Sequence, residues 1–148
     1  MAPYIDDDLP MISLGQRGLW LARAELLHAQ GDAEGALRIF DALGASAKNA
    51  GDRGARAIPY LALVRARALI DLGRLDEAGE DLKAGLEGAR RAQARGIEWQ
   101  ILAASADRRL AAGRDDEARS QFALAFGIVQ QLALTIDDPG LRHMYLIS

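Results

Sequence analysis

A short block of residues recurs three times along this chain of 148 residues. The block reads GDAEGA from Gly31, GRLDEA from Gly73 and GRDDEA from Gly113. A fixed period of roughly 40 residues, as here, lies within the range that is typical of stacked structural repeats rather than of one irregular core. The chain is therefore expected to fold as a row of similar units.

The composition indicates that these units are helical. Alanine, leucine, arginine and glutamate are abundant, and all four favour helices. Valine and isoleucine are sparse, which argues against a sheet. Half of the residues are hydrophobic and 26% are charged, as in an ordinary folded domain. We expect an all-α fold that forms a single domain over residues 1–148.

The pattern of apolar residues and helix-ending signals divides the chain into helices. Repeats are expected at about 15–50, 56–95 and 97–133, each with two helices, followed by a capping helix at about 138–147. Gly31 and Gly73 are expected to end helices, Gly96 to separate the fourth helix from the fifth, and Asp32 and Asp138 to cap helix starts. Gly85, inside the fourth helix, indicates either close helix packing or a bend. The last long helix is expected to bury Ala118, Phe122, Phe126 and Val129.

At this point the residues resemble the tetratricopeptide (TPR) repeat family. That family places W-x2-L-G-x2-Y on a first helix and Ala-x3-Phe on a second. The corresponding second-helix pairs here are Ala36 and Phe40, Ala78 and Leu82, and Ala118 and Phe122. The first repeat also has Trp20, Ala24 and Leu27 at the first-helix positions. The resemblance implies a helical-hairpin solenoid of three repeats and six helices, closed by the capping helix.

Three departures from the family pattern stand out. The usual leucine before the small residue is Arg23, Arg65 or Ser105, and Arg109 stands where leucine or an aromatic is expected. The proline that closes a repeat is absent. The period also exceeds the family's usual length of about 34 residues, which implies longer helices. Such repeats are similar to helical segments of large bacterial regulatory ATPases and transcription activators, so the chain is interpreted as a fragment or a free-standing relative of a regulatory module.

The resemblance also implies where a partner binds. The family presents a concave groove built from the first helix of each repeat, and it binds proteins or peptides there. Carried over to this sequence, the groove positions are Leu21, Glu25, His28, Leu63, Arg67, Ile70, Asp71, Ala103, Asp107 and Leu110.

The sequence lacks the usual motifs for catalysis, cofactors and metals. There is no cysteine, no phosphate-binding glycine loop and no nucleophile motif, and the two histidines lack metal-ligand spacing. The carboxylates are interpreted as helix caps and ion-pair partners. The arginines Arg90, Arg91, Arg95, Arg108 and Arg109 are interpreted either as a solvated face or as one basic patch for an acidic peptide or phosphate. Trp20 is expected to pack in the core, and Trp99 either to pack or to serve as an exposed anchor.

The overall charge and hydropathy argue against nucleic acid and membranes as partners. A net charge of −3 gives no general attraction to nucleic acid, and no apolar run is long enough for a membrane span. The start of the sequence is acidic and does not read as a secretory signal, so a cytoplasmic location is expected. The function expected is a non-enzymatic module without cofactor that binds a protein or peptide. The alternative is a homo-oligomerising helical domain, including a homodimer.

Overall fold

The computed structural model describes residues 14–49 and 58–147, and this part of the chain is almost entirely helical. It contains seven α-helices and no strand, which confirms the all-α class. The helices are α1 (Leu14–Ala29), α2 (Ala33–Asn49), α3 (Pro59–Asp71), α4 (Leu75–Arg91), α5 (Arg95–Ala111), α6 (Asp115–Ala133) and α7 (Pro139–Ile147). The expected acidic helix start at Asp6–Asp8 and the loop around Gly51–Gly54 lie outside the described residues.

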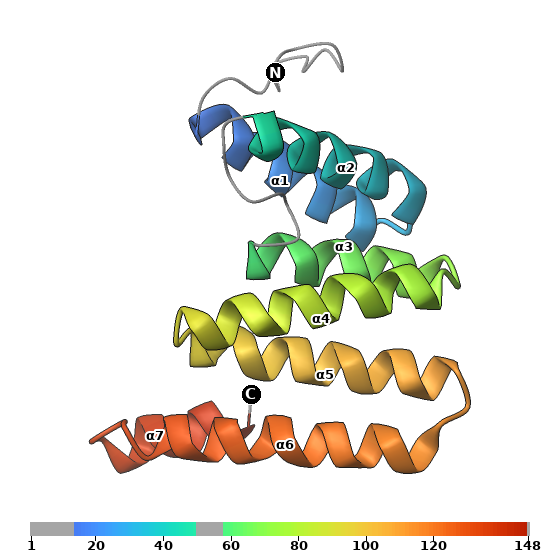
Figure 1. Ribbon diagram of the computed structural model, residues 1–148. Coiled ribbons are helices and arrows are strands. Elements are labelled where there is room, and N and C mark those ends of the chain that lie inside the picture. The colour runs from blue at the N-terminus through green and yellow to red at the C-terminus, as the bar shows by residue number, and fades with distance from the viewer. Residues whose placement is uncertain (1–13, 50–57, 148) are drawn as a thin grey trace.

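Consecutive helices run antiparallel and pack against one another in chain order (Figure 1). The pairs α1–α2, α3–α4 and α5–α6 are helical hairpins, each closed by one of the three glycine blocks. Between hairpins, α2 packs on α3 and α4 packs on α5, and α3 also contacts α5. The short helix α7 lies at the end of α6. We call α1, α3 and α5 the first helices, and α2, α4 and α6 the second helices.

The four tight turns between helices share one backbone geometry. In each, a residue just after the helix is left-handed: Gly31 (φ 89°), Gly73 (φ 72°), Gln93 (φ 55°) and Gly113 (φ 73°). The next residue donates its N–H to a carbonyl five residues earlier, for example Arg74 N to Leu69 O at 2.9 Å. This is the Schellman motif, which satisfies the last carbonyls of a helix.

Polar caps begin two of the helices as the sequence predicts. Asp32 Oδ1 accepts a hydrogen bond of 2.8 Å from the N–H of Gly35, in the first turn of α2. Asp138 Oδ1 accepts from the N–H groups of Gly140 and Leu141, in the first turn of α7. Pro59 occupies the first turn of α3, where the missing N–H costs nothing.

The core runs along the row of helices rather than collecting in one centre. One apolar cluster joins α1, α2 and α3, a second joins α2 to α5, and a third joins α5 and α6. Close packing of α3 on α4 depends on Gly85, because a Cβ there would lie 3.0 Å from the Cβ of Ala62. Gly85 is thus a position of close helix packing. Trp20 is buried in the first cluster, and Trp99 packs partly buried against the third.

Two sequence expectations about the fold are wrong. Gly96 lies inside α5, and the break between α4 and α5 is the left-handed Gln93. Phe122 and Phe126 are exposed on α6; Ala118 is buried as expected, and the other buried side chains include Ala125 and Ile128. The expected final helix is present, but none of its residues is buried. Phe122 and Phe126 stay exposed although this helix is present.

Candidate functional site

The first helices bring several of the predicted groove residues together. His28 Nε2 of α1 lies 2.5 Å from Asp71 Oδ2 of α3. Glu25 of α1 accepts a hydrogen bond from the hydroxyl of Tyr60 in α3. These two polar contacts join the first helix of one hairpin to the first helix of the next. Three of the predicted positions thus help to hold α1 beside α3.

Tyr60 belongs to this contact, and it is not among the predicted groove positions. Its hydrogen bond to the Glu25 carboxylate, together with partial burial, raises the pKa of the Tyr60 hydroxyl above its usual value of 10.0. The nearby guanidinium of Arg67 opposes this shift in pKa. The signal in the sequence was an aromatic residue directly after Pro59, in the first turn of a first helix.

The remaining predicted groove positions differ in how far they are buried: one is fully buried, three are partly buried and three are exposed. Leu63 is fully buried in the second core cluster, so its assignment to the groove is wrong. Residues of α4 and α5 pack around Leu63 in that cluster. The position of Leu63 in the TPR motif does not show that these helices cover it. Leu21, Ile70 and Ala103 are partly buried at the edges of the three clusters. Each of them is thus only partly open to a partner.

Besides Asp71, which pairs with His28, three predicted positions on α3 and α5 are exposed to solvent. They are Arg67, Asp107 and Leu110. Among the described residues, neither Arg67 nor Asp107 forms an ion pair. We call the surface formed by α1, α3 and α5 at these predicted positions, without Leu63, the first-helix face. It carries one cation, carboxylates and apolar side chains next to one another.

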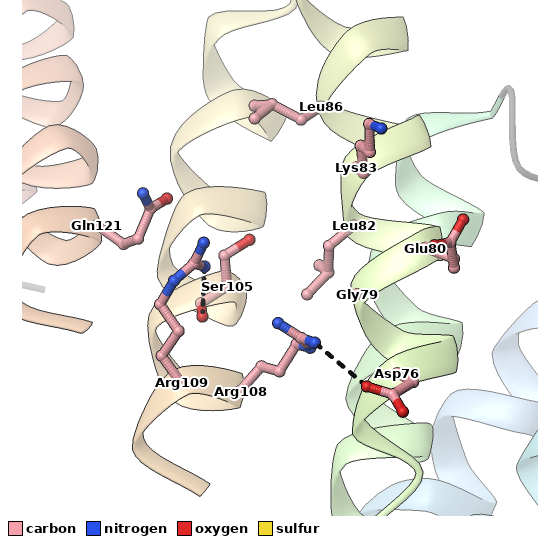
Figure 2. Close-up of a pocket in the computed structure, with 10 residues that line it drawn as sticks. All are labelled: Asp76, Gly79, Glu80, Leu82, Lys83, Leu86, Ser105, Arg108, Arg109 and Gln121. Atoms are coloured by element: carbon pink, nitrogen blue, oxygen red, sulfur yellow. Dashed lines mark hydrogen bonds and ion pairs between the residues drawn. The ribbon is translucent and has the colours of Figure 1, made fainter. Parts of the chain in front are cut away.

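A cleft of about 540 Å³ lies on the other side of α5 (Figure 2). Helical spacing places its α5 residues Ser105, Arg108 and Arg109 on the side opposite Ala103 and Asp107. Second helices form its walls, and the lining residues are Asp76, Gly79, Glu80, Leu82, Lys83, Leu86, Ser105, Arg108, Arg109 and Gln121. Its size is that of a small-molecule site, but its lining is more charged than such sites usually are.

The two arginines of the cleft are held by partners within the chain. Arg108 Nε donates to the carbonyl of Leu75 at 2.5 Å, and its guanidinium lies over Gly79 and 3.8 Å from Asp76. Figure 2 shows it reaching from α5 to the start of α4. These contacts fasten α4 to α5 and occupy the arginine that a ligand would need.

Arg109 is engaged in the same way on the other side of the cleft. It donates to the carbonyl of Ser105 at 3.2 Å and to Glu117 of α6 at 3.3 Å. In α3 the equivalent residues, counted from the block glycine, are Ala68 and Leu69, which are fully buried. The cleft is therefore the place where two arginines replace apolar packing residues between hairpins.

The arginines do not form a single basic patch. Arg90 and Arg95 both pair with Glu98, a buried carboxylate in the first turn of α5. Arg108 and Arg109 lie in the last turn of the same helix. About 13 residues of helix separate the two groups, or roughly 20 Å at about 1.5 Å per residue. The interpretation as one patch for an acidic ligand is wrong.

Features for metal binding and membrane crossing are missing from residues 14–49 and 58–147. No group of three or more His, Asp or Glu side chains there is placed to hold a metal ion. Within the same residues, no helix combines the length and the apolar character that crossing a bilayer requires.

Comparisons of the chain with protein-family models, with curated proteins and with solved structures find no match. The residues and their geometry therefore carry the functional proposal.

Proposed function

We propose that this chain is a non-catalytic protein-interaction module that binds a peptide or protein segment across its first-helix face. In this proposal the three hairpins form a TPR-like solenoid with α7 at its end. The shared Schellman turns and the packing of α3 beside α5 support that arrangement. The fully buried alanines at the same step of each block, Ala36, Ala78 and Ala118, support it as well.

The observation that carries the proposal is the chemistry of the exposed positions on α3 and α5. Arg67 and Asp107 present opposite charges without ion pairs among the described residues, and Leu110 adds an exposed apolar side chain. Ile70 and Ala103, on the same two helices, are partly buried at the edges of core clusters. A surface of this kind suits an extended or helical peptide that offers a carboxylate, a cation and an apolar anchor.

The cleft of Figure 2 is the weaker candidate because its cationic groups are already engaged. Arg108 and Arg109 would have to leave Leu75, Glu117 and the Ser105 carbonyl before they could bind an anion. The free energy lost with these charge-assisted hydrogen bonds would offset the free energy gained from binding a new ligand.

The test begins with a library of random peptides displayed on phage and selected on the full chain. Enriched peptides are synthesised with a fluorophore, and their dissociation constants are measured by anisotropy. Charge reversal in Arg67→Glu and truncation in Leu110→Ala should each weaken binding by about tenfold or more, since both side chains contact the peptide. Leu124→Ala is the matched control, because Leu124 is exposed on α6, away from this face.

The proposal fails if no peptide is enriched. It also fails if peptides bind with equal affinity to the wild type and to both first-helix variants. Leu63→Asp is unsuitable for this test, because Leu63 is fully buried and a carboxylate there would unfold the chain.

A further inference from the structure

The two ends of the row of helices expose apolar side chains at positions that are buried between hairpins elsewhere. Equivalent positions are those at the same distance from the block glycine of each hairpin. On a first helix, the positions twelve and nine residues before the glycine are Leu61 and Val64 in α3. The same positions are Ile101 and Ala104 in α5, and all four side chains are buried.

These positions of the first helices face the second helix of the preceding hairpin. Leu61 and Val64 share an apolar cluster with Phe40 of α2. Ile101 shares a cluster with Leu82 of α4. Phe40 and Leu82 are equivalent, since each lies nine residues after its block glycine. The chain thus uses one type of interface twice, once between α2 and α3 and once between α4 and α5.

The first hairpin has the same front surface, and no other hairpin of the described residues packs on it. Leu19 of α1, the equivalent of Leu61, has 64% of its surface exposed, whereas Leu61 has 7%. Ala22, the equivalent of Val64, and Leu26 one turn further on are exposed as well. An exposed leucine alone is ordinary, but here the exposed residues begin with the two positions that the other first helices bury.

The last hairpin has the matching rear surface. Phe122 of α6 is 39% exposed, whereas the equivalent Phe40 and Leu82 are 0% and 3% exposed. Phe126, one turn further along, is more exposed still. In repeat proteins, an outer face that has no neighbouring unit is normally polar, which keeps the protein soluble. Here the α1 stripe (Leu19, Ala22 and Leu26) and the α6 stripe (Phe122 and Phe126) are both apolar.

We infer that the chain associates head to tail with a second copy of itself, the α1 stripe of one copy packing on the α6 stripe of the other. The contact continues the interface that already joins α2 to α3 and α4 to α5. Because the two surfaces differ, the contact is heterologous, and each added copy leaves one stripe of each kind open. This inference rests on the repeat register and is independent of the peptide-binding function proposed above.

The experiment is size-exclusion chromatography with light scattering on the full chain over a wide concentration range. The mass should rise above the 15.9 kDa of one chain as the concentration increases, because open stripes keep adding copies. A mass that stays at that of a single chain at every concentration would overturn the inference, and this result depends on no variant.

Two end variants then distinguish head-to-tail contact from symmetric pairing. Leu19→Glu/Leu26→Glu removes the α1 stripe, and Phe122→Glu/Phe126→Glu removes the α6 stripe. Each alone should stay monomeric, with association weakened about 30-fold or more, as expected for a central interface side chain. An equimolar mixture should form a dimer and nothing larger, because each variant supplies the stripe that the other lacks.

The control is Leu124→Glu, an exposed leucine on α6 that lies two residues from both phenylalanines and so off their stripe. It should associate like the wild type. Circular dichroism confirms that every variant keeps its helices. Association of either end variant on its own, or loss of association in the Leu124 control, would overturn the head-to-tail contact.

Discussion

At the residue scale, the left-handed position of the Schellman turn favours glycine but also accepts another residue in this chain. Three of the four turns place glycine there, and the turn between α4 and α5 places Gln93 at φ 55°. A left-handed conformation costs a residue with a Cβ roughly 1–2 kcal/mol, a cost that glycine avoids. The turn still forms, since Ala94 N donates to Ala89 O at 2.8 Å.

Gln93→Gly should therefore raise the free energy of unfolding by about 0.5–1 kcal/mol. Gly73→Gln, the reverse change at the equivalent position of another turn, should lower it by about 1 kcal/mol or more. Urea denaturation monitored by circular dichroism measures both. A destabilised Gln93→Gly variant would contradict this account of the turn.

The same turns show what the sequence could and could not predict for single residues. Gly31 and Gly73 were predicted to end helices, because glycine reaches positive φ without strain. The same rule predicts the break between α4 and α5 at Gly96, but the hydrogen bonds of the turn select Gln93 and leave Gly96 in α5. The hydrogen bonds that end α4 thus outweigh the preference of glycine for a left-handed conformation. The sequence does not reveal where those hydrogen bonds form.

Tyr60 supplies a prediction for alkaline pH. Its hydroxyl donates to Glu25, and the pKa of the hydroxyl is raised above 10.0. The contribution of this contact to stability is present below the unfolded pKa of 10.0 and is lost as the pH rises through the higher folded pKa. The free energy of unfolding should therefore fall above about pH 10 by more in the wild type than in Tyr60→Phe.

The measurement is urea denaturation of both proteins from neutral to strongly alkaline pH, with phenolate absorbance as a second readout. The absorbance difference between wild type and Tyr60→Phe isolates one of the chain's three tyrosines. Glu25→Gln should bring this titration back toward the usual pKa, because it removes the carboxylate. Identical pH profiles of stability for wild type and Tyr60→Phe would refute the role given to this contact.

At the element scale, a charged side chain links three helices where the TPR pattern has leucine. Arg65 of α3 donates to Asp41 of α2 at 2.8 Å and to Asp81 of α4. The Asp81 side chain is fully buried, and Arg65 is largely buried. In the first hairpin the position equivalent to Asp81 is Ile39. The link between α2, α3 and α4 thus depends on the ion pair of Arg65 with Asp81. At the position of Asp81, the first hairpin has a buried apolar side chain instead.

Arg65→Leu should lower the free energy of unfolding by about 3–5 kcal/mol, because it leaves Asp81 buried without its cation. The double variant Arg65→Leu/Asp81→Ile should recover to within about 1 kcal/mol of the wild type, since the buried charge is gone and apolar packing replaces it. Chemical denaturation of the wild type, both single variants and the double variant forms the complete cycle. Additive losses in the double variant would show that the two side chains do not act as a pair.

The elements themselves were largely predictable, and their outer surfaces were not. The six long helices and the final helix follow from apolar periodicity, capping residues and the repeated block. Phe122 and Phe126 were expected inside because they continue the apolar pattern of α6. They are exposed because no further hairpin covers α6 among the described residues. The error at Leu63 is the opposite one: it was expected on the accessible groove and is fully buried. Its position in the TPR motif does not reveal which neighbouring helices pack over it.

At the scale of the whole molecule, the structure is a row in which each hairpin packs on the next. The largest fully buried side chains are Phe40, Leu63, Leu69, Ile101, Leu102 and Asp81, and all of them belong to helices α2 to α5. The outermost helices α1 and α6 each keep an apolar stripe open. The proposed partner surface and the proposed head-to-tail contact both depend on this arrangement.

The central claim, that the molecule is a row of packed hairpins, is tested most directly by hydrogen exchange on the full chain at low concentration. Local stability in such a row is set by contacts with neighbouring units. We predict that the amides of α3, α4 and α5 exchange slowest, and that those of α1 and of α6 with α7 exchange faster. Uniform protection over all seven described helices, or slowest exchange in α1 or α6, would contradict the account.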